Sequence, residues 1–283
     1  MPEVLKYDEI GYWSEIKLYI IKDYASEYSR ILNNQYNPSF YHIYIDAFAG
    51  AGKHKSKNTG EFIPGSPTNA LSVRPAFKEY HFIDIKEQKI ESLEDIAGTR
   101  KDVHIHHGDC NHILLDKVLP KVKYEDYRRA LCILDPYGLH LDWKVTSKIG
   151  QMNSLEIFLN FPVYDINLNV LRKRPESVSP DQIDRMNKFW GDDSWRKIAY
   201  TQSKQMPLPL IGEDEEEKVS NDVIAEAFRS RLKKVAGFKN VPKPIAMRNS
   251  QNAIIYYLFF ASHKPVAENI VTYIFQKYAD RRG

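Results

Sequence analysis

Carboxylates and glycines follow several short apolar runs in the first half of the chain, at places where strands are expected to end. The run 41–46 (YHIYID) ends in Asp46, and Gly50 and Gly52 follow within a few residues. Such alternation of apolar and polar residues predicts a strand. Three more runs share this design: 79–85 with Asp84, 102–107 with Asp109 just beyond it, and 130–135 with Asp135. Ligands of an open α/β sheet lie at the carboxyl ends of its strands, so the four acids are predicted to meet at one ligand.

These residue types indicate what the ligand is. Glycine lets the backbone approach a ligand closely, and an acid after the second strand, Asp84, is placed to accept hydrogen bonds from ribose hydroxyls. A nicotinamide dinucleotide would require a third glycine where Lys55 stands. S-adenosylmethionine carries no phosphates, and its ammonium and sulfonium groups favour acidic surroundings. We therefore predict S-adenosylmethionine as the cofactor, bound by residues at the strand ends: Asp46, Phe48, Ala49, Gly50, Gly52, Asp84, Ile85, Gly108, Asp109 and Cys110. The alternative for Asp46 is the cap of a following helix.

Four histidines near Cys110 raise the question of a metal site: His104, His106, His107 and His112. In a strand, the period of two sends His104 and His106 to one face and His107 to the other. No second pair of ligands stands at zinc spacing, so no metal site is predicted. Cys110 and Cys132 are expected to pack as small apolar residues.

The predicted strands are separated by segments with helical spacing, which positions their ends on one edge. Helices are expected at 86–97, 111–119 and 141–152, with a fifth strand at 154–161. Strands alternating with helices predict an α/β fold with a mostly parallel sheet covered on both faces. The last two strands, 241–247 and 253–261, are joined by too few residues for a crossover helix and should pair antiparallel. Further helices are predicted at 10–33, 219–236 and 265–280.

We expect one domain over 1–283, with a helical N-terminal extension over 1–38 and a charged helical insertion over 162–216. The insertion contains a helical pattern at 180–190, the basic run Arg172, Lys173 and Arg174, and an acidic tract at 213–217. The basic run is a candidate for phosphate contacts, whereas the acidic tract would repel a nucleic-acid backbone. The insertion is equally a candidate surface for a partner protein.

Composition limits the class of protein but not its activity. The chain has 283 residues, of which 43% are hydrophobic and 27% charged, and its formal net charge is +3. These values are typical of a globular protein and are compatible with nucleic acid without requiring it. Two cysteines, no signal-peptide start and no apolar run of about 18 residues predict a reduced, cytoplasmic protein without a membrane segment.

The order of these motifs resembles a known family. Asp46-x-Phe48-x-Gly50-x-Gly52, Gly65-Ser66-Pro67, Phe82-Ile83-Asp84, Gly108-Asp109 and Asp135-Pro136-Tyr137-Gly138 are similar to the motifs of the three-Cys-motif partner (TcmP) proteins, within the Rossmann-like class I methyltransferase fold. The resemblance covers nearly the whole chain, with Asn160-Phe161-Pro162 and a late segment at 256–262. It implies a seven-stranded sheet with an antiparallel last strand and a possible partner protein that carries a three-Cys motif. A more distant similarity is to the ribosomal-RNA adenine-N6 methyltransferases of the RlmJ type.

This resemblance implies N-methylation of an exocyclic amine of a nucleic-acid base, with RNA or DNA adenine favoured. Asp135 would orient the amine, the Pro136 carbonyl would assist, and Tyr137 would stack on a flipped base. Ser66 and the basic run would contact the substrate, and the loop 53–60 would close as a lid. Ser66 is also a natural cap for a helix over 68–73.

One departure from the family's motif leaves other interpretations open. The second proline of the amine-methylating motif Asp-Pro-Pro-Tyr is absent, since Tyr137 follows Pro136 directly. The segment 135–138 is therefore equally well explained as the turn that ends a buried strand. The alternative function is a binding protein that retains the methyltransferase fold and acts with a neighbouring gene's product.

Overall fold

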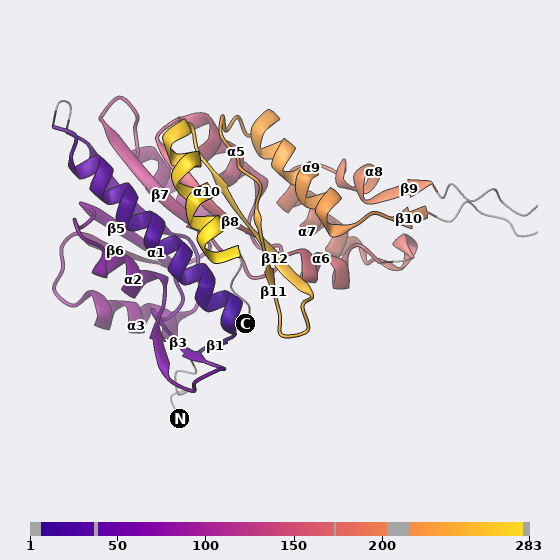
Figure 1. The fold of residues 1–283 in the computed structure, drawn as a ribbon, viewed down its shortest axis with the longest axis horizontal. Coiled ribbons are helices and arrows are strands. Elements are labelled where there is room, and N and C mark those ends of the chain that lie inside the picture. The colour runs from indigo at the N-terminus through magenta and orange to yellow at the C-terminus, as the bar shows by residue number, and fades with distance from the viewer. Residues whose placement is uncertain (1–6, 37–38, 173, 203–215, 280–283) are drawn as a thin grey trace, which may run out of the picture.

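A seven-stranded sheet forms the centre of the computed structural model, which describes residues 7–36, 39–172, 174–202 and 216–279 (Figure 1). Along the sheet, the strands are β11 (Ile245–Arg248), β12 (Ile254–Ala261), β8 (Leu155–Phe161), β7 (Arg128–Leu134), β2 (Tyr41–Asp46), β5 (Glu79–Asp84) and β6 (Val103–His107). β12 runs antiparallel to both of its neighbours, and the pairs from β8 to β6 are parallel. The chain thus has the α/β fold, with an antiparallel last strand, that its sequence predicts.

Each central strand buries both of its faces. Ile43 and Ile45 of β2 point into one apolar cluster, and Tyr44 between them points into the other. This follows from the period of two along a strand. Because all three are at most 1% exposed, helices must cover the sheet on both sides.

The covering helices fall into two layers. One layer consists of α1 (Tyr12–Asn33), α2 (Ser66–Ser72), α3 (Glu87–Ala97) and α10 (Pro265–Ala279). The other contains α4 (Cys110–Ile113), α5 (Trp143–Met152) and α9 (Asn221–Lys234). Figure 1 shows α1 and α10 side by side in front of the sheet. The helix predicted over 111–119 is wrong in its form, because α4 passes into a π turn (Leu114–Val118) and then a 3₁₀ turn (Leu119–Lys121). Pro120 lacks the N–H that a continued α-helix would need.

The segment between β8 and α9 adds α6 (Val163–Asn169), α7 (Pro180–Trp190) and α8 (Trp195–Ala199), a 3₁₀ turn (Pro175–Ser177), and the two-stranded pair β9 (Tyr200–Gln202) and β10 (Glu216–Lys218). Phe189 of α7 stacks on Phe228 of α9 with ring centroids 5.6 Å apart, and it also packs on Phe161 of β8. α7 therefore shares the main core. Lys173 and positions 213–215 of the acidic tract lie outside the described residues.

A second, small sheet lies at the carboxyl edge of the large one. It pairs β1 (Glu9–Ile10) with β3 (Lys53–Ser56), and β3 with β4 (Phe62–Pro64). The loop expected over 53–60 is thus partly strand. Its polar sequence does not predict a strand, but hydrogen bonds to β1 and β4 stabilise β3 as one.

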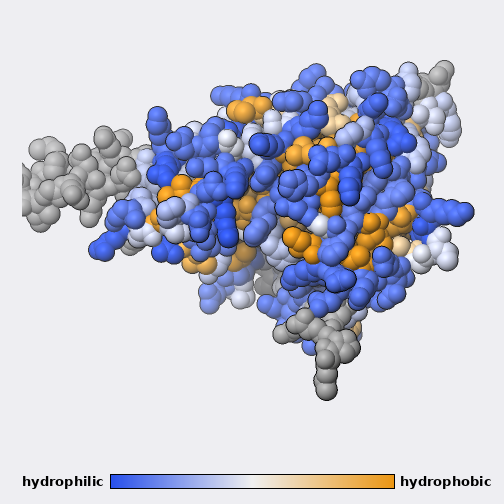
Figure 2. Space-filling model, turned by 180° about the vertical axis from the view of Figure 1, so that it is seen from behind, coloured by the Kyte–Doolittle hydropathy of each residue, from blue (hydrophilic) through white to orange (hydrophobic). Residues whose placement is uncertain are grey.

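The surface and the helices show two further features. On the face opposite to that of Figure 1, apolar residues form separate patches between hydrophilic ones (Figure 2). Within the described part of the chain, none of the helices combines the length and the apolar character needed to cross a bilayer.

Candidate functional site

The carboxyl ends of β2, β5, β6 and β7 lie next to one another at one edge of the sheet. A cavity of about 570 Å³ opens there, and it is lined by Asp84 at the end of β5 and by the segments that follow β2, β5, β6 and β7. Its lining includes Phe48, Asp84, Ile85, Gly108, Asp109, Cys110 and Tyr137 from the set predicted to form the site. Arg185 and Lys188 of α7 complete the wall from the segment between β8 and α9.

The glycine turn after β2 provides one boundary of the site. Gly50 and Gly52 both have left-handed backbone, with φ of +65° and +71°. A Cβ at Gly50 would meet nothing within 4 Å, so this turn presents bare backbone toward open space. At Gly52 a Cβ would lie 2.4 Å from Cδ1 of Ile96, the tip of a side chain that can move, so it is the left-handed backbone that favours glycine there. Ala49 is buried, and its N–H donates to the Ile83 carbonyl at 2.9 Å.

Asp46 is fully buried at the end of β2. Its Oδ1 accepts the Phe48 N–H at 3.3 Å, and its Oδ2 has no hydrogen-bond partner among the described residues. Burial raises the pKa of this carboxyl to about 7, although the nearby Ser66 side chain lowers it. A buried oxygen without a donor is the kind of acceptor that a cationic ligand would satisfy.

Two other predicted acids already hold backbone groups. Asp84 accepts the Gly50 N–H through Oδ2 and the Lys86 N–H through Oδ1, both at 2.9 Å. Asp109 is the N-cap of α4, because its Oδ1 accepts the Asn111 N–H at 2.7 Å. Each carboxylate oxygen has a second lone pair, so these contacts preorganise the acids without blocking them. The buried Cys110 thiol has its pKa raised to about 12 by burial and packs as an apolar group.

Asp135 lies at the end of β7 and is held from two sides. Lys17 of α1 donates to its Oδ2 and forms an ion pair with it, and the Asn160 amide donates to its Oδ1 at 2.8 Å. Burial lowers the pKa of Lys17, but the charge of Asp135 more than offsets this, and the pKa is raised overall. The sequence alone suggested that the Asp135 carboxylate is a free acceptor for an amine. In the structure it already accepts from Lys17 and Asn160, so any substrate must share it with these two donors.

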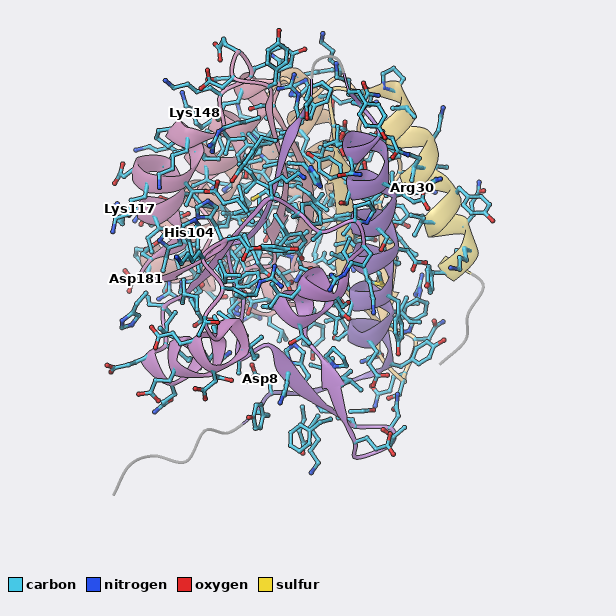
Figure 3. All side chains as sticks on the ribbon, turned by 90° about the vertical axis from the view of Figure 1, so that its left-hand side faces the viewer. Asp8, Arg30, His104, Lys117, Lys148 and Asp181 are labelled. Atoms are coloured by element: carbon cyan, nitrogen blue, oxygen red, sulfur yellow. The ribbon has the colours of Figure 1, made fainter. Side chains whose placement is uncertain are left out.

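Tyr137 extends from the same turn across the mouth of the site. Its side chain is largely exposed, yet its hydroxyl donates to Asp8 at 3.1 Å and accepts from Lys89 at 2.9 Å. Lys89 also pairs with Asp8 at 2.8 Å and lies 5.1 Å from the Tyr137 ring centroid. Asp8 stands beside the small sheet at the carboxyl edge (Figure 3). These contacts fasten the N-terminal segment and α3 to the Tyr137 turn, while Pro136 lies buried just before it.

The residues predicted to bind substrate are not gathered in one place. Ser66 is the first residue of α2, whose N-cap is Gly65, so its predicted role as the cap is wrong. Arg172 donates to the Leu168 carbonyl at 3.1 Å, and neither it nor Arg174 lines the cavity. Lys173 falls outside the described residues.

Sequence reasoning missed four residues of the site: Asp8, Lys17, His54 and Lys89. The last three lie on secondary-structure elements, and Lys17 carried a signal, since it interrupts the apolar stripe of α1. His54 of β3 is placed so that its Nδ1 is buried without a partner among the described residues. The pKa of His54 is lowered by burial and by the charge of Lys17, which keeps the ring neutral near pH 7.

The histidines of β5 and β6 form a chain away from this site. His81 Nδ1 lies 3.0 Å from His106 Nε2, and His81 Nε2 lies 2.8 Å from Glu79. His104 stacks on His81 and is well separated from Asp8 in Figure 3. Within the ranges that the structure describes, no three His, Cys, Asp or Glu side chains are arranged to hold a metal ion.

The strand order, the antiparallel β12 and a cavity at the carboxyl ends of the parallel strands define the Rossmann-like class I methyltransferase fold. Among solved structures, a Legionella pneumophila protein of the family model DUF519 aligns with a TM-score of 0.50 and 12% identity, over 93% of this chain and 92% of its own. A provisionally assigned methyltransferase from Thermobifida fusca aligns with a TM-score of 0.43, over 89% and 80% of the two chains. The CurJ carbon methyltransferase aligns with 0.40, over 85% and 53%. These two are also 12% identical to the chain. No family model and no curated protein sequence matches.

Proposed function

We propose that the protein is an S-adenosylmethionine-dependent methyltransferase that N-methylates an exocyclic amine of a nucleic-acid base. One observation carries the proposal: Asp135, held by Asn160, begins the turn whose Tyr137 lines a cavity formed at the carboxyl ends of four neighbouring parallel strands. Ligands of open α/β sheets bind at such ends, near the switch in strand order. Here the order reverses between β2 and β7.

The residues present fit this cofactor. The unpartnered Oδ2 of Asp46 would accept from the ammonium group, and the bare turn at Gly50 would lie against the ligand. Asp84 keeps lone pairs for the ribose hydroxyls, and Asp109 and Cys110 line the far end of the cavity. When bound, S-adenosylmethionine supplies an activated methyl group.

This chain's own residues would orient the acceptor. Asp135 accepts hydrogen bonds, so it can hold an amine N–H with the nitrogen lone pair directed at the methyl group. Asn160 and Lys17 fix the carboxylate in position. Tyr137, which is 58% exposed, offers a ring for base stacking.

Isothermal titration of the full chain with S-adenosylmethionine and with its demethylated product tests the proposal. We expect micromolar binding that is lost in Asp84→Ala, because that change removes the ribose acceptor and the brace of Gly50. Asp95→Ala, an exposed acid on α3, is the matched control and should bind normally. Tritiated methyl transfer to RNA, DNA and protein then identifies the acceptor. An absence of heat with both ligands would refute a methyltransferase.

The alternative, a partner-dependent binding protein with this fold, is favoured by one observation. Both oxygens of Asp135 are already used, by Lys17 and Asn160, so the site resembles a closed polar network. In that case the TcmP-like resemblance points to a three-Cys-motif partner. Co-expression with the neighbouring gene's product and gel filtration would yield a stable complex, and the chain alone would transfer no methyl group.

A further inference from the structure

A second and larger cavity lies along β11, the outermost strand of the large sheet, and extends from the carboxyl edge, where Arg248 ends β11, to the amino edge, where Lys243 precedes it. It is a groove of about 1640 Å³ between the N-terminal end of α1, the β11–β12 hairpin and α10. β12 is reversed, so its first residues lie at the edge where β8 ends; Tyr257 pairs with Phe161. Figure 1 shows the tip of the hairpin beside the start of α1. The groove and the cofactor cavity share none of their lining residues, so they are separate sites.

The groove reaches the acceptor position of the proposed reaction through two side chains. Tyr256 lines the groove, and Lys17 Nζ lies 5.1 Å from the centroid of its ring. Lys17 in turn binds Asp135. On the neighbouring strand, Asn160 pairs with Leu258 of β12 and donates to Asp135. A molecule in the groove would therefore be separated from Asp135 only by the buried side chains of Tyr256 and Lys17.

The charges of the groove favour an anion. Four cationic side chains line it, Lys57, Arg229, Lys243 and Arg248, against two carboxylates, Asp222 and Glu268. Asp222 is engaged by the Tyr257 hydroxyl at 2.6 Å. Lys57 and Lys243 are exposed, and no acid of the described residues is close enough to form an ion pair with either. These two amines are available to phosphates, and Arg248, which already donates to the Asn252 carbonyl at 2.8 Å, can add a contact through its remaining N–H groups.

The groove also has aromatic walls. Tyr12 and Trp13 at the start of α1 are both half-buried and form an edge-to-face pair with centroids 5.6 Å apart. Aromatic side chains interleaved with cations are the surfaces on which single-stranded nucleic acids bind, because bases stack on rings while phosphates contact the cations. A duplex would have to release its target base before that base could reach Asp135.

We propose that this groove binds the single strand of nucleic acid that carries the acceptor base. Its phosphates contact Lys57, Lys243 and Arg248, and a base adjacent to the target stacks on Trp13. In this proposal the groove provides the phosphate contacts that the sequence predicted for Arg172, Lys173 and Arg174. The inference rests on the proposed function for the identity of the acceptor, but the binding it describes is measured separately.

Fluorescence anisotropy with a labelled single-stranded oligoadenylate of about 12 nucleotides, as RNA and as DNA, tests the groove. The triple variant Lys57→Gln, Lys243→Gln, Arg248→Gln should bind roughly tenfold or more weakly, and its slope of log affinity against log salt should fall by about 2. The matched control is Lys101→Gln, Lys117→Gln, Lys144→Gln, three exposed lysines outside both cavities, which should bind as the parent does. Trp13→Ala should lose between about 5-fold and 150-fold.

Thermal unfolding shows that each variant is folded, and titration with S-adenosylmethionine separates the two proposals. If the groove variants lose the oligonucleotide but no chain transfers methyl groups, the groove stands and the proposed function fails. Equal binding by the parent and the triple variant overturns the groove, whatever the activity. So does a lack of binding by the parent at about 100 µM, where even non-specific sites bind. Equal competition by a polyglutamate peptide would assign the groove to an acidic protein and likewise overturn the inference.

Discussion

Asp46 combines complete burial with an Oδ2 that makes no full hydrogen bond among the described residues, although the Ser66 side chain is close enough to the carboxyl to lower its pKa. Its pKa, raised to about 7 by burial, means that half of the carboxyls are neutral at that pH. A cation binds the ionised form, so affinity for S-adenosylmethionine should be weak below pH 7 and rise as the pH passes through about 7. Binding should also release protons.

Calorimetry at several pH values, in buffers of different ionisation enthalpy, measures both effects. In Asp46→Asn the affinity should be lower and independent of pH between about 6 and 8, because the carboxyl that would face the cofactor's ammonium group no longer titrates. The Asp95→Ala control should keep the slope of the parent. A parent affinity that does not change across this range would contradict the role of Asp46.

The ion pair of Lys17 and Asp135 predicts unequal costs for its two halves. The Lys17 side chain is 11% exposed and that of Asp135 is 31% exposed. Asp135→Asn leaves a buried ammonium without its counter-ion, so it should lower the free energy of unfolding by about 3 kcal/mol. Lys17→Met should cost less, because Asp135 keeps Asn160 and access to water.

Urea unfolding of both single variants and of the double variant measures these costs. The double variant should lose less than the sum of the singles, since the unpaired charge is gone. Arg30→Met on the same helix removes the exposed pair with Glu27 and should cost under about 1 kcal/mol. Strict additivity in the cycle would mean that Lys17 and Asp135 do not interact.

At the scale of elements, the sequence predicts the strands well because their apolar character is continuous. The runs at β2, β5, β7 and β8 are within two residues of their observed bounds. β3 was missed because Lys53–Ser56 is polar, and its strand form depends on pairing with β1 and β4. The acids at the strand ends were predicted from the order of the motifs along the chain. The partners of Asp135 were not predicted, because Lys17 is 118 positions away and a single sequence does not show which distant residues meet.

One contact of α5 depends on glycine, because it leaves no room for a Cβ at position 150. Gly150 of α5 lies against the segment that follows α9, and a Cβ there would be 2.2 Å from the Ala236 carbonyl oxygen. Backbone cannot move aside as a side-chain tip does, so Gly150→Ala should destabilise the protein by about 1–3 kcal/mol, despite the higher helix propensity of alanine.

Thermal and urea unfolding of Gly150→Ala check this contact. Gly11→Ala is the matched control, since a Cβ at Gly11 meets nothing within 4 Å. Because Gly11 is the N-cap of α1, Gly11→Ala should lower the free energy of unfolding by at most about 1 kcal/mol. If Gly150→Ala were as stable as the parent, α5 could not lie as close to residue 236 as the structure places it.

Over the whole molecule, buried groups of two kinds oppose each other in acid. Burial raises the pKa of Asp46 and of Glu156 to about 7, and burial lowers the pKa of His42 and of His106 to about 4. Between about pH 4.5 and 6.5 the native carboxyls hold protons that the unfolded chain has released, so their contribution to stability falls as the pH rises. The native histidines lack protons that the unfolded chain holds, so their contribution rises with pH.

These opposite slopes predict that variants which remove one kind of group tilt away from the parent profile in opposite directions over that window. Asp46→Asn with Glu156→Gln should make stability rise more steeply with pH than in the parent, because the opposing carboxyl contribution is gone. His42→Gln with His106→Gln should tilt the profile the other way. Urea midpoints at steps of half a pH unit and constant ionic strength measure the tilt, and the comparison holds even if each pair of changes lowers stability at every pH. Parallel profiles for the parent and both variants would show that these four groups titrate alike in the folded and unfolded chains, and that their burial does not govern how the molecule responds to acid.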